Sequence, residues 1–255
     1  MYTFKSFISE SAKSDKYEND MAKHIADMGL DASRPAVDPT YSDILIKYKG
    51  DRIWLEVKMN HSDQLGNTRA SFDGKKWIAA IDKKGPSKGK LSPLKAYITK
   101  TLNNDKDTQA WLKDLEKFSG IKGMKVPTLI SGLSDPKSVP RDVMIAYLKG
   151  KKQYILNKPE VDLGELITQH YLKGKSEPAY YMQAGDDFYR IGSANPMGVP
   201  NDVPLLSGTG PFKMRIGMRS KYYEVQPEVK ITKMPSSKYS LKPGTSKLNP
   251  FENIK

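Results

Sequence analysis

The clearest pattern of apolar and polar positions along the chain lies in residues 52–59. In an extended strand, successive side chains point to opposite faces. An apolar run over residues 41–48 comes before it, and the turn signal Lys49-Gly50-Asp51 separates the two. The pattern predicts a β-hairpin with charged groups on one face of its second strand. The two faces of that strand carry different side chains: one has Ile53, Leu55, Val57 and Met59, and the other has Trp54, Glu56 and Lys58.

Helical spacing of apolar residues, or alternation bounded by turn residues, predicts the other elements. The chain is thus expected to combine helices and strands in an α/β (α+β) fold. The expected helices cover residues 14–29, 93–103, 107–118 and about 160–172; the expected strands include 76–81 and hairpins at 180–192 and 212–232.

The charge balance indicates the class of partner. Lys and Arg total 42 against 29 acidic residues, a net charge of +13. A field of this sign attracts phosphate backbones or anionic membranes. No stretch approaches the about 20 apolar residues of a membrane span, so we expect DNA as the partner and no membrane. The first residues lack a long apolar run, so no signal peptide is expected and the protein should not be secreted.

The scarcity of soft metal ligands narrows the possible chemistry. The chain has no cysteine and three histidines. Thiolate zinc sites, disulfides and cysteine nucleophiles are therefore excluded, and a multi-histidine metal site is not expected. A metal bound by this chain should be hard and held by carboxylates, which favours Mg²⁺, with Mn²⁺ able to substitute.

The predicted hairpin can supply such carboxylates. Glu56 and Lys58 project from the same face of one strand, and Asp43 lies at the start of the preceding strand. Hydrolysis of a phosphodiester needs a metal that polarises the phosphate and lowers the pKa of a water, with a cation nearby to offset charge. Two carboxylates and a lysine in this pattern meet that need.

This arrangement, Ser42-Asp43 followed by Glu56-Val57-Lys58, resembles the PD-(D/E)xK nuclease superfamily, which includes restriction enzymes, phage exonucleases and Holliday-junction resolvases. The resemblance implies that Asp43 and Glu56 bind the metal and that Lys58 positions the attacking water. Ser42 stands where the family has proline, a departure that leaves the ligands in place.

The resemblance covers roughly residues 14–80. It implies a restriction-endonuclease-like mixed β-sheet core flanked by helices, here with an additional C-terminal β-rich region. Many members add a carboxylate from the first helix, and Glu18 matches that placement. Restriction-type and resolvase-type members are usually dimers, which favours a homodimer by analogy.

Other interpretations of these residues stay open at this point. Glu56 and Lys58 could form a solvated strand face, although Trp54 on that face argues against it. Glu18 could close a capping box with Asp15 at a helix start. The Glu-x-Lys pattern alone has little weight, because Glu228-Val-Lys230 repeats it without a preceding aspartate.

The segment after Lys58 is rich in side-chain donors, where a scissile strand would run. Contacts to phosphates or bases are expected there, although an ordinary polar loop would have the same composition. His61 is a weaker candidate for the role of general base. The expected nucleic-acid contacts are Gln64, Asn67, Arg69, Lys75 and Lys76.

The first ten residues resemble the capsid-targeting leader of internal head proteins in T-even-like bacteriophages. They are aromatic and amphipathic and end in Ile8-Ser9-Glu10. The resemblance implies cleavage after Glu10 by a phage prohead protease and packaging in the capsid interior. The alternative is an N-terminal helix that packs on the core. The expected segments are the leader 1–10, a nuclease core 11–130, a C-terminal α+β region 131–232 and a basic flexible tail 233–255.

Three functions are consistent with these features. The leading hypothesis is a Mg²⁺-dependent DNA endonuclease, packaged in the phage virion or acting in the host cytoplasm. The second is a non-catalytic, basic DNA-binding or internal head protein with a nuclease-like fold. The third is an injected inhibitor of a host enzyme, with the C-terminal hairpins as its contact surface.

Overall fold

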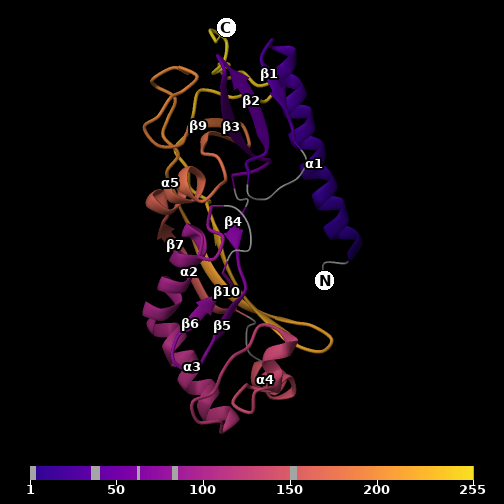
Figure 1. Ribbon diagram of the computed structural model, residues 1–255, viewed down its shortest axis with the longest axis vertical. Helices are drawn as coiled ribbons and strands as arrows, with labels where there is room; N and C mark the ends of the chain where they lie inside the picture. The colour runs from indigo at the N-terminus through magenta and orange to yellow at the C-terminus, as the bar shows by residue number, and fades with distance from the viewer. Residues whose placement is uncertain (1–3, 36–40, 62–63, 82–85, 150–153, 255) are drawn as a thin grey trace. The chain divides into compact units, whose positions relative to one another are not determined.

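The computed structural model describes residues 4–35, 41–61, 64–81, 86–149 and 154–254 (Figure 1). The chain divides into two compact units. The first comprises Met1–Asp63, Leu163–Thr209 and Thr232–Lys255, and the second comprises Gln64–Asp162 and Gly210–Ile231. The described residues contain five α-helices and two β-sheets, so the expected mixed α/β class is confirmed.

The first unit is built on a five-stranded sheet in the order β1-β2-β3-β8-β9. Strands β2 and β3 form the predicted antiparallel hairpin, β3 pairs parallel with β8, and β8 pairs antiparallel with β9. The sheet is therefore mixed, and α1 runs alongside β1 (Figure 1). The elements of this unit are α1 (Phe4–Asp27), β1 (Asp31–Ser33), β2 (Ile44–Tyr48), β3 (Asp51–Lys58), α5 (Gly164–Lys173), β8 (Ala179–Ala184) and β9 (Asp187–Arg190).

The hydrophobic core of the first unit lies on the apolar face of β3. Met21 and Ile25 of α1 are buried against this face because they recur at helical spacing. The alternation that predicted the hairpin therefore serves to bury one face of the strand. Its buried members on β3 are Ile53, Leu55 and Val57.

The C-terminal segment is folded, so the expectation of a flexible tail after residue 232 is wrong. Tyr239, Leu241 and Phe251 are buried in the same core. The backbone N–H of Phe188 donates to the Tyr239 carbonyl at 2.9 Å, and the Phe251 ring lies 5.5 Å from that of Phe188. The average composition of this segment is polar and basic, but a few large apolar residues suffice to anchor it.

The second unit contains a sheet in the order β6-β5-β11-β10-β7, with β4 also paired to β11. The hairpin expected at 212–232 and the helices expected at 93–103 and 107–118 are all present. The elements are β4 (Gln64–Asn67), β5 (Ala70–Phe72), β6 (Trp77–Ala79), α2 (Pro93–Asn104), α3 (Lys106–Ser119), the 3-10 helix η1 (Ile130–Ser134), α4 (Arg141–Leu148), β7 (Tyr154–Asp162), β10 (Thr209–Met218) and β11 (Tyr223–Lys230).

Local sequence explains the ends of the helices. Pro93 begins α2, where its fixed φ suits the first turn and its missing N–H leaves nothing unsatisfied. Gly120 ends α3 at a φ of 69°, and its N–H donates to the Glu116 carbonyl. A residue with a side chain would be strained in this left-handed conformation.

Several expected boundaries are corrected by the structure. The segment 11–130 is not one core, because the chain leaves the first unit after Asp63 and returns to it only at Leu163. The helix expected at 160–172 begins at Gly164, since β7 continues to Asp162. Residues 131–232 are likewise divided between the two units.

The first helix begins at Phe4 and not at residue 14, and it runs unbroken past Glu10. The Ser11-Ala-Lys-Ser14 stretch does not interrupt it. Serine lowers helix stability by only a few tenths of a kcal/mol, roughly, when helical neighbours lie on both sides. No helix within the described residues is long and apolar enough to cross a bilayer.

Candidate active site

Asp43 and Glu56 meet at one end of the sheet in the first unit. Ile44 pairs with Leu55 across the β2–β3 hairpin, which sets Asp43 beside Glu56 one position further along. The backbone N–H of Val57 donates to Asp43 Oδ2 at 2.8 Å and fixes this carboxylate against β3. The local hairpin register therefore brings two acidic groups together.

Glu56 and Lys58 are not on a solvated face, so that interpretation is wrong. Glu56 is 3% exposed and Trp54, two positions earlier, is 2% exposed. The Trp54 indole N–H donates to Glu177 Oε2 at 2.7 Å, which covers this side of β3. Strand β3 is buried on both faces, because α1 and the C-terminal segment cover one, and Tyr41 and Glu177 lie against Trp54 on the other.

Two lysines face the two oxygens of the Glu56 carboxylate. Lys58 Nζ lies 2.5 Å from Oε1, and Lys175 Nζ lies 3.7 Å from Oε2. Burial alone would raise the pKa of Glu56, but the charges of Lys58 and Lys175 outweigh it and hold the pKa below its usual range. Glu56 is thus ionised in a buried position.

The negative charge of Glu56 also shifts the pKa of its two neighbours, Asp43 and Lys58. Burial, and then the negative charge of Glu56, raise the pKa of Asp43 to about 7. Burial would lower the pKa of Lys58, but the Glu56 carboxylate holds it well above its usual value. Lys58 is therefore a protonated cation at neutral pH, and Asp43 shares its site with a like charge.

Helix α5 and the residue that follows it form another side of the site. Burial and the charge of Lys175 lower the pKa of His170 to about 4, so this imidazole is neutral. Burial and the charge of Glu56 raise the pKa of Tyr171. Lys175 is a site residue that the sequence gave no reason to single out, because one lysine among many carries no signal before the fold is known.

Glu18 lies near the site, but it already has a cationic partner. Its Oε2 is 2.6 Å from Arg34 Nη2, and the Ser14 hydroxyl donates to its Oε1 at 2.9 Å. Its charge contributes to the raised pKa of Asp43. The capping-box interpretation is wrong, because Asp15 lies well inside α1. In the part of the chain that the structure describes, no three acidic or histidine residues form a metal-binding group, so Glu18 does not complete a carboxylate triad.

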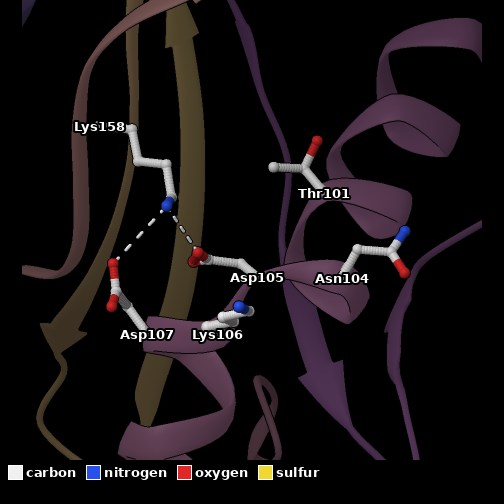
Figure 2. A pocket seen from close by; sticks show the side chains of 6 residues that line it. All are labelled: Thr101, Asn104, Asp105, Lys106, Asp107 and Lys158. Atoms are coloured by element: carbon white, nitrogen blue, oxygen red, sulfur yellow. Dashed lines mark ion pairs between the residues drawn. The ribbon is translucent and has the colours of Figure 1, made fainter.

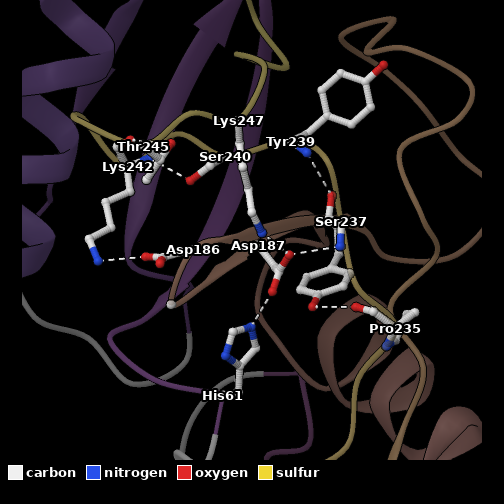
Figure 3. A network of polar contacts seen from close by, with 12 residues as sticks. His61, Asp186, Asp187, Pro235, Ser237, Tyr239, Ser240, Lys242, Thr245 and Lys247 are labelled. Atoms are coloured by element: carbon white, nitrogen blue, oxygen red, sulfur yellow. Dashed lines mark hydrogen bonds and ion pairs between the residues drawn. The ribbon is translucent and has the colours of Figure 1, made fainter.

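His61 belongs to a polar network rather than standing alone (Figure 3). Its Nε2 lies 2.7 Å from Asp187 Oδ2, while Asp187 Oδ1 accepts from the Ser237 N–H at 2.8 Å and faces Lys247 Nζ at 2.5 Å. The network ties the end of β3, the start of β9 and the C-terminal segment together. Its position indicates a structural role in holding that segment.

The expected nucleic-acid contacts all belong to the second unit, whereas Asp43, Glu56 and Lys58 belong to the first. Gln64 and Asn67 lie on β4. Arg69 Nη2 lies 2.8 Å from the buried Glu224, so its charge is already partnered. Their role as contacts remains a prediction. Lys75 and Lys76 are exposed in the turn between β5 and β6.

A hollow of about 460 Å³ in the second unit offers a second group of polar side chains (Figure 2). Lys158 Nζ lies 2.8 Å from Asp105 Oδ1 and 3.6 Å from Asp107 Oδ2. The lysine offsets the charge of both carboxylates and occupies the place a cation would take.

The side chains at Asp43 and Glu56 fit a hard divalent cation. Carboxylate oxygens are the ligands that Mg²⁺ prefers. Glu56 Oε2 is buried and has no hydrogen-bond partner among the described residues, an arrangement that leaves it available to a ligand. The like-charge contact between the two carboxylates is also what a shared cation would relieve.

Comparison with known proteins adds only a distant likeness. No protein-family model and no curated protein matches the chain. Among solved structures, the chain is similar to HhaI endonuclease in complex with DNA, with a TM-score of 0.29 and 13% identity over 85% of this chain and 88% of that one. A likeness this weak carries no argument about function, which must come from the site.

Proposed function

We propose that this protein is a Mg²⁺-dependent DNA endonuclease whose active site is formed by Asp43, Glu56 and Lys58. The observation that carries the proposal is the pair of neighbouring carboxylates, Glu56 buried and Asp43 half-buried, with a protonated lysine on Glu56. Structural positions seldom retain two carboxylates and two lysines together, because burying charges is costly. Function is the simplest reason for such a group.

Each of the three residues would have a different role in phosphodiester hydrolysis. Asp43 and Glu56 would hold the cation, and Mg²⁺ when bound supplies Lewis-acid polarisation of the phosphate and a water of lowered pKa. Lys58 orients the attacking water and offsets developing negative charge. Because the pKa of Lys58 lies well above its usual value, it acts as a cation and hydrogen-bond donor and not as a general base.

DNA is the proposed substrate because of the charge of the chain. The net charge of +13 favours a phosphate backbone and gives binding that weakens as salt rises. Neither the sequence nor the geometry of the site selects a base sequence, so the proposal extends to phosphodiester cleavage in duplex or branched DNA.

The test is cleavage of supercoiled plasmid by the purified protein with Mg²⁺. Cleavage should appear, and Glu56→Gln and Lys58→Met should each abolish it. Lys230→Met is the matched control, because Lys230 ends the second Glu-x-Lys sequence, on β11. This variant should cleave DNA at the normal rate. Uncut DNA of every form, including modified and branched DNA, would reject the proposal.

We also propose that the protein is packaged in a phage head and trimmed after Glu10. The support is the leader-like sequence ending in Ile8-Ser9-Glu10. Mass spectrometry of the protein from purified particles should find an N-terminus at Ser11. Protein from particles that begins at Met1 would contradict this part of the proposal and leave the nuclease unaffected.

A further inference from the structure

The backbone after α5 delivers Lys175 to the site. Gly174 ends the helix, and its N–H donates to the His170 carbonyl at 3.0 Å. A Cβ at Gly174 would lie 2.5 Å from that carbonyl oxygen, so no other residue fits without a shift of the backbone. Two residues beyond Lys175, Glu177 is fixed on β3 by Trp54. Lys175 is thus held from both sides.

The Lys175 side chain points inward although it carries a charge. It is 12% exposed, and its ammonium donates to the Tyr41 carbonyl at 3.1 Å. Its distance of 3.7 Å from Glu56 Oε2 is too long for a hydrogen bond. An ammonium has three donors, and the described residues accept from one of them.

Lys58 and Lys175 therefore differ in what they can do. Lys58 is in direct contact with Glu56 Oε1, while Lys175 lies 3.7 Å from Oε2, the carboxylate oxygen without a hydrogen bond. A ligand bound at Glu56 would lie within reach of that ammonium. A negatively charged oxygen of that ligand would have a cation already in position, with no reorganisation needed.

We propose that Lys175 is a second catalytic cation, which contacts a non-bridging oxygen of the scissile phosphate. The inference rests on the proposed nuclease function and adds a residue to it. In this role Lys175 offsets the negative charge that grows on the phosphate during attack. A merely structural counter-ion of Glu56 would affect folding instead.

The experiment compares Lys175→Met with Lys173→Met in single-turnover cleavage of labelled duplex DNA with Mg²⁺ and excess enzyme. Methionine keeps the length of the side chain and removes its charge. Lys173 is a matched control, because it lies two residues earlier and is exposed. Loss of one preorganised group of this kind lowers a rate by roughly 10²–10³-fold. We expect that loss for Lys175→Met at saturating DNA, and less than about a twofold change for Lys173→Met.

A chemical rescue separates catalysis from folding. The chain has no cysteine, so Lys175→Cys introduces a single thiol. Alkylation with 2-bromoethylamine restores an ammonium at nearly the original length, and mass spectrometry gives the modified fraction. The cleavage rate should recover in proportion to that fraction. The unmodified Lys175→Cys protein should show the same thermal unfolding as Lys175→Met.

The outcomes distinguish this inference from the function on which it rests. If the unaltered protein does not cleave, the proposed function fails and the inference fails with it. If it cleaves and Lys175→Met cleaves equally fast, only the role of Lys175 is rejected. Loss of rate that merely follows loss of folded protein, or full alkylation without recovery, would also reject it.

Discussion

Asp43→Asn should stabilise the metal-free protein while it abolishes cleavage. The substitution keeps an oxygen to accept the Val57 N–H and removes the like charge beside Glu56. The pKa of Asp43 is raised from 3.8 to about 7, and each unit corresponds to about 1.36 kcal/mol. The ionised carboxylate therefore costs at most about 4 kcal/mol of folding free energy.

The sign of the pH dependence follows from proton binding. A carboxyl whose pKa is raised on folding binds more protons in the folded state. The contribution of Asp43 to the free energy of unfolding therefore falls as pH rises from about 4 to about 7, the window between its unfolded and folded pKa values. Relaxation of the chain and of water around the charge reduces this effect. We therefore expect Asp43→Asn to raise the free energy of unfolding by about 2–4 kcal/mol at pH 8. At pH 5 the gain should be less than half of this.

Thermal unfolding in chelator at pH 5 and pH 8 measures this effect. For a protein of this size, about 1 kcal/mol shifts Tm by roughly 2–4 °C, so Asp43→Asn should unfold roughly 4–16 °C higher at pH 8. Asp51→Asn, at the exposed start of β3, should change Tm little at either pH. A lower Tm for Asp43→Asn at pH 8 would show that the two carboxylates do not repel each other as described.

Three further predictions concern the metal, the C-terminal segment and the polar network. Millimolar Mg²⁺ should raise the Tm of the unaltered protein at pH 8, and the shift should vanish in Glu56→Gln; equal shifts would place the cation elsewhere. Phe251→Ala should destabilise the first unit by about 3–5 kcal/mol in urea unfolding, whereas a free tail would give no change. Asp187→Asn should cost about 1–3 kcal/mol and speed amide exchange at Ser237, and unchanged exchange would contradict the network.

Local sequence was sufficient for the hairpin and for the meeting of Asp43 with Glu56. Alternation with period two sets the faces of β3, and the turn at residues 49–51 sets the register of β2. These are short-range properties, since residues close in sequence decide them. The helices α2 and α3 were predictable for the same reason.

Lys175 and the division into two units could not be predicted in this way. Strand β3 pairs with β8, which follows it only after the whole of Gln64–Asp162 and α5. No periodicity within either strand records that parallel pairing, because it depends on which surfaces remain to be buried once the hairpin has formed. The fold of the C-terminal segment was equally unpredictable, because its composition is mostly polar although Phe251 is buried in the core.

The sequence by itself therefore determined the acidic pair and Lys58, the excess of positive charge and the mixed α/β class. Only the tertiary structure decided that Glu56 is buried, that Arg34 engages Glu18, and that Lys175 reaches the other oxygen of Glu56. The physical reason is that burial and charge are collective properties. A side chain acquires its environment from segments distant in sequence, and the pKa of Asp43 and Glu56 follows from that environment.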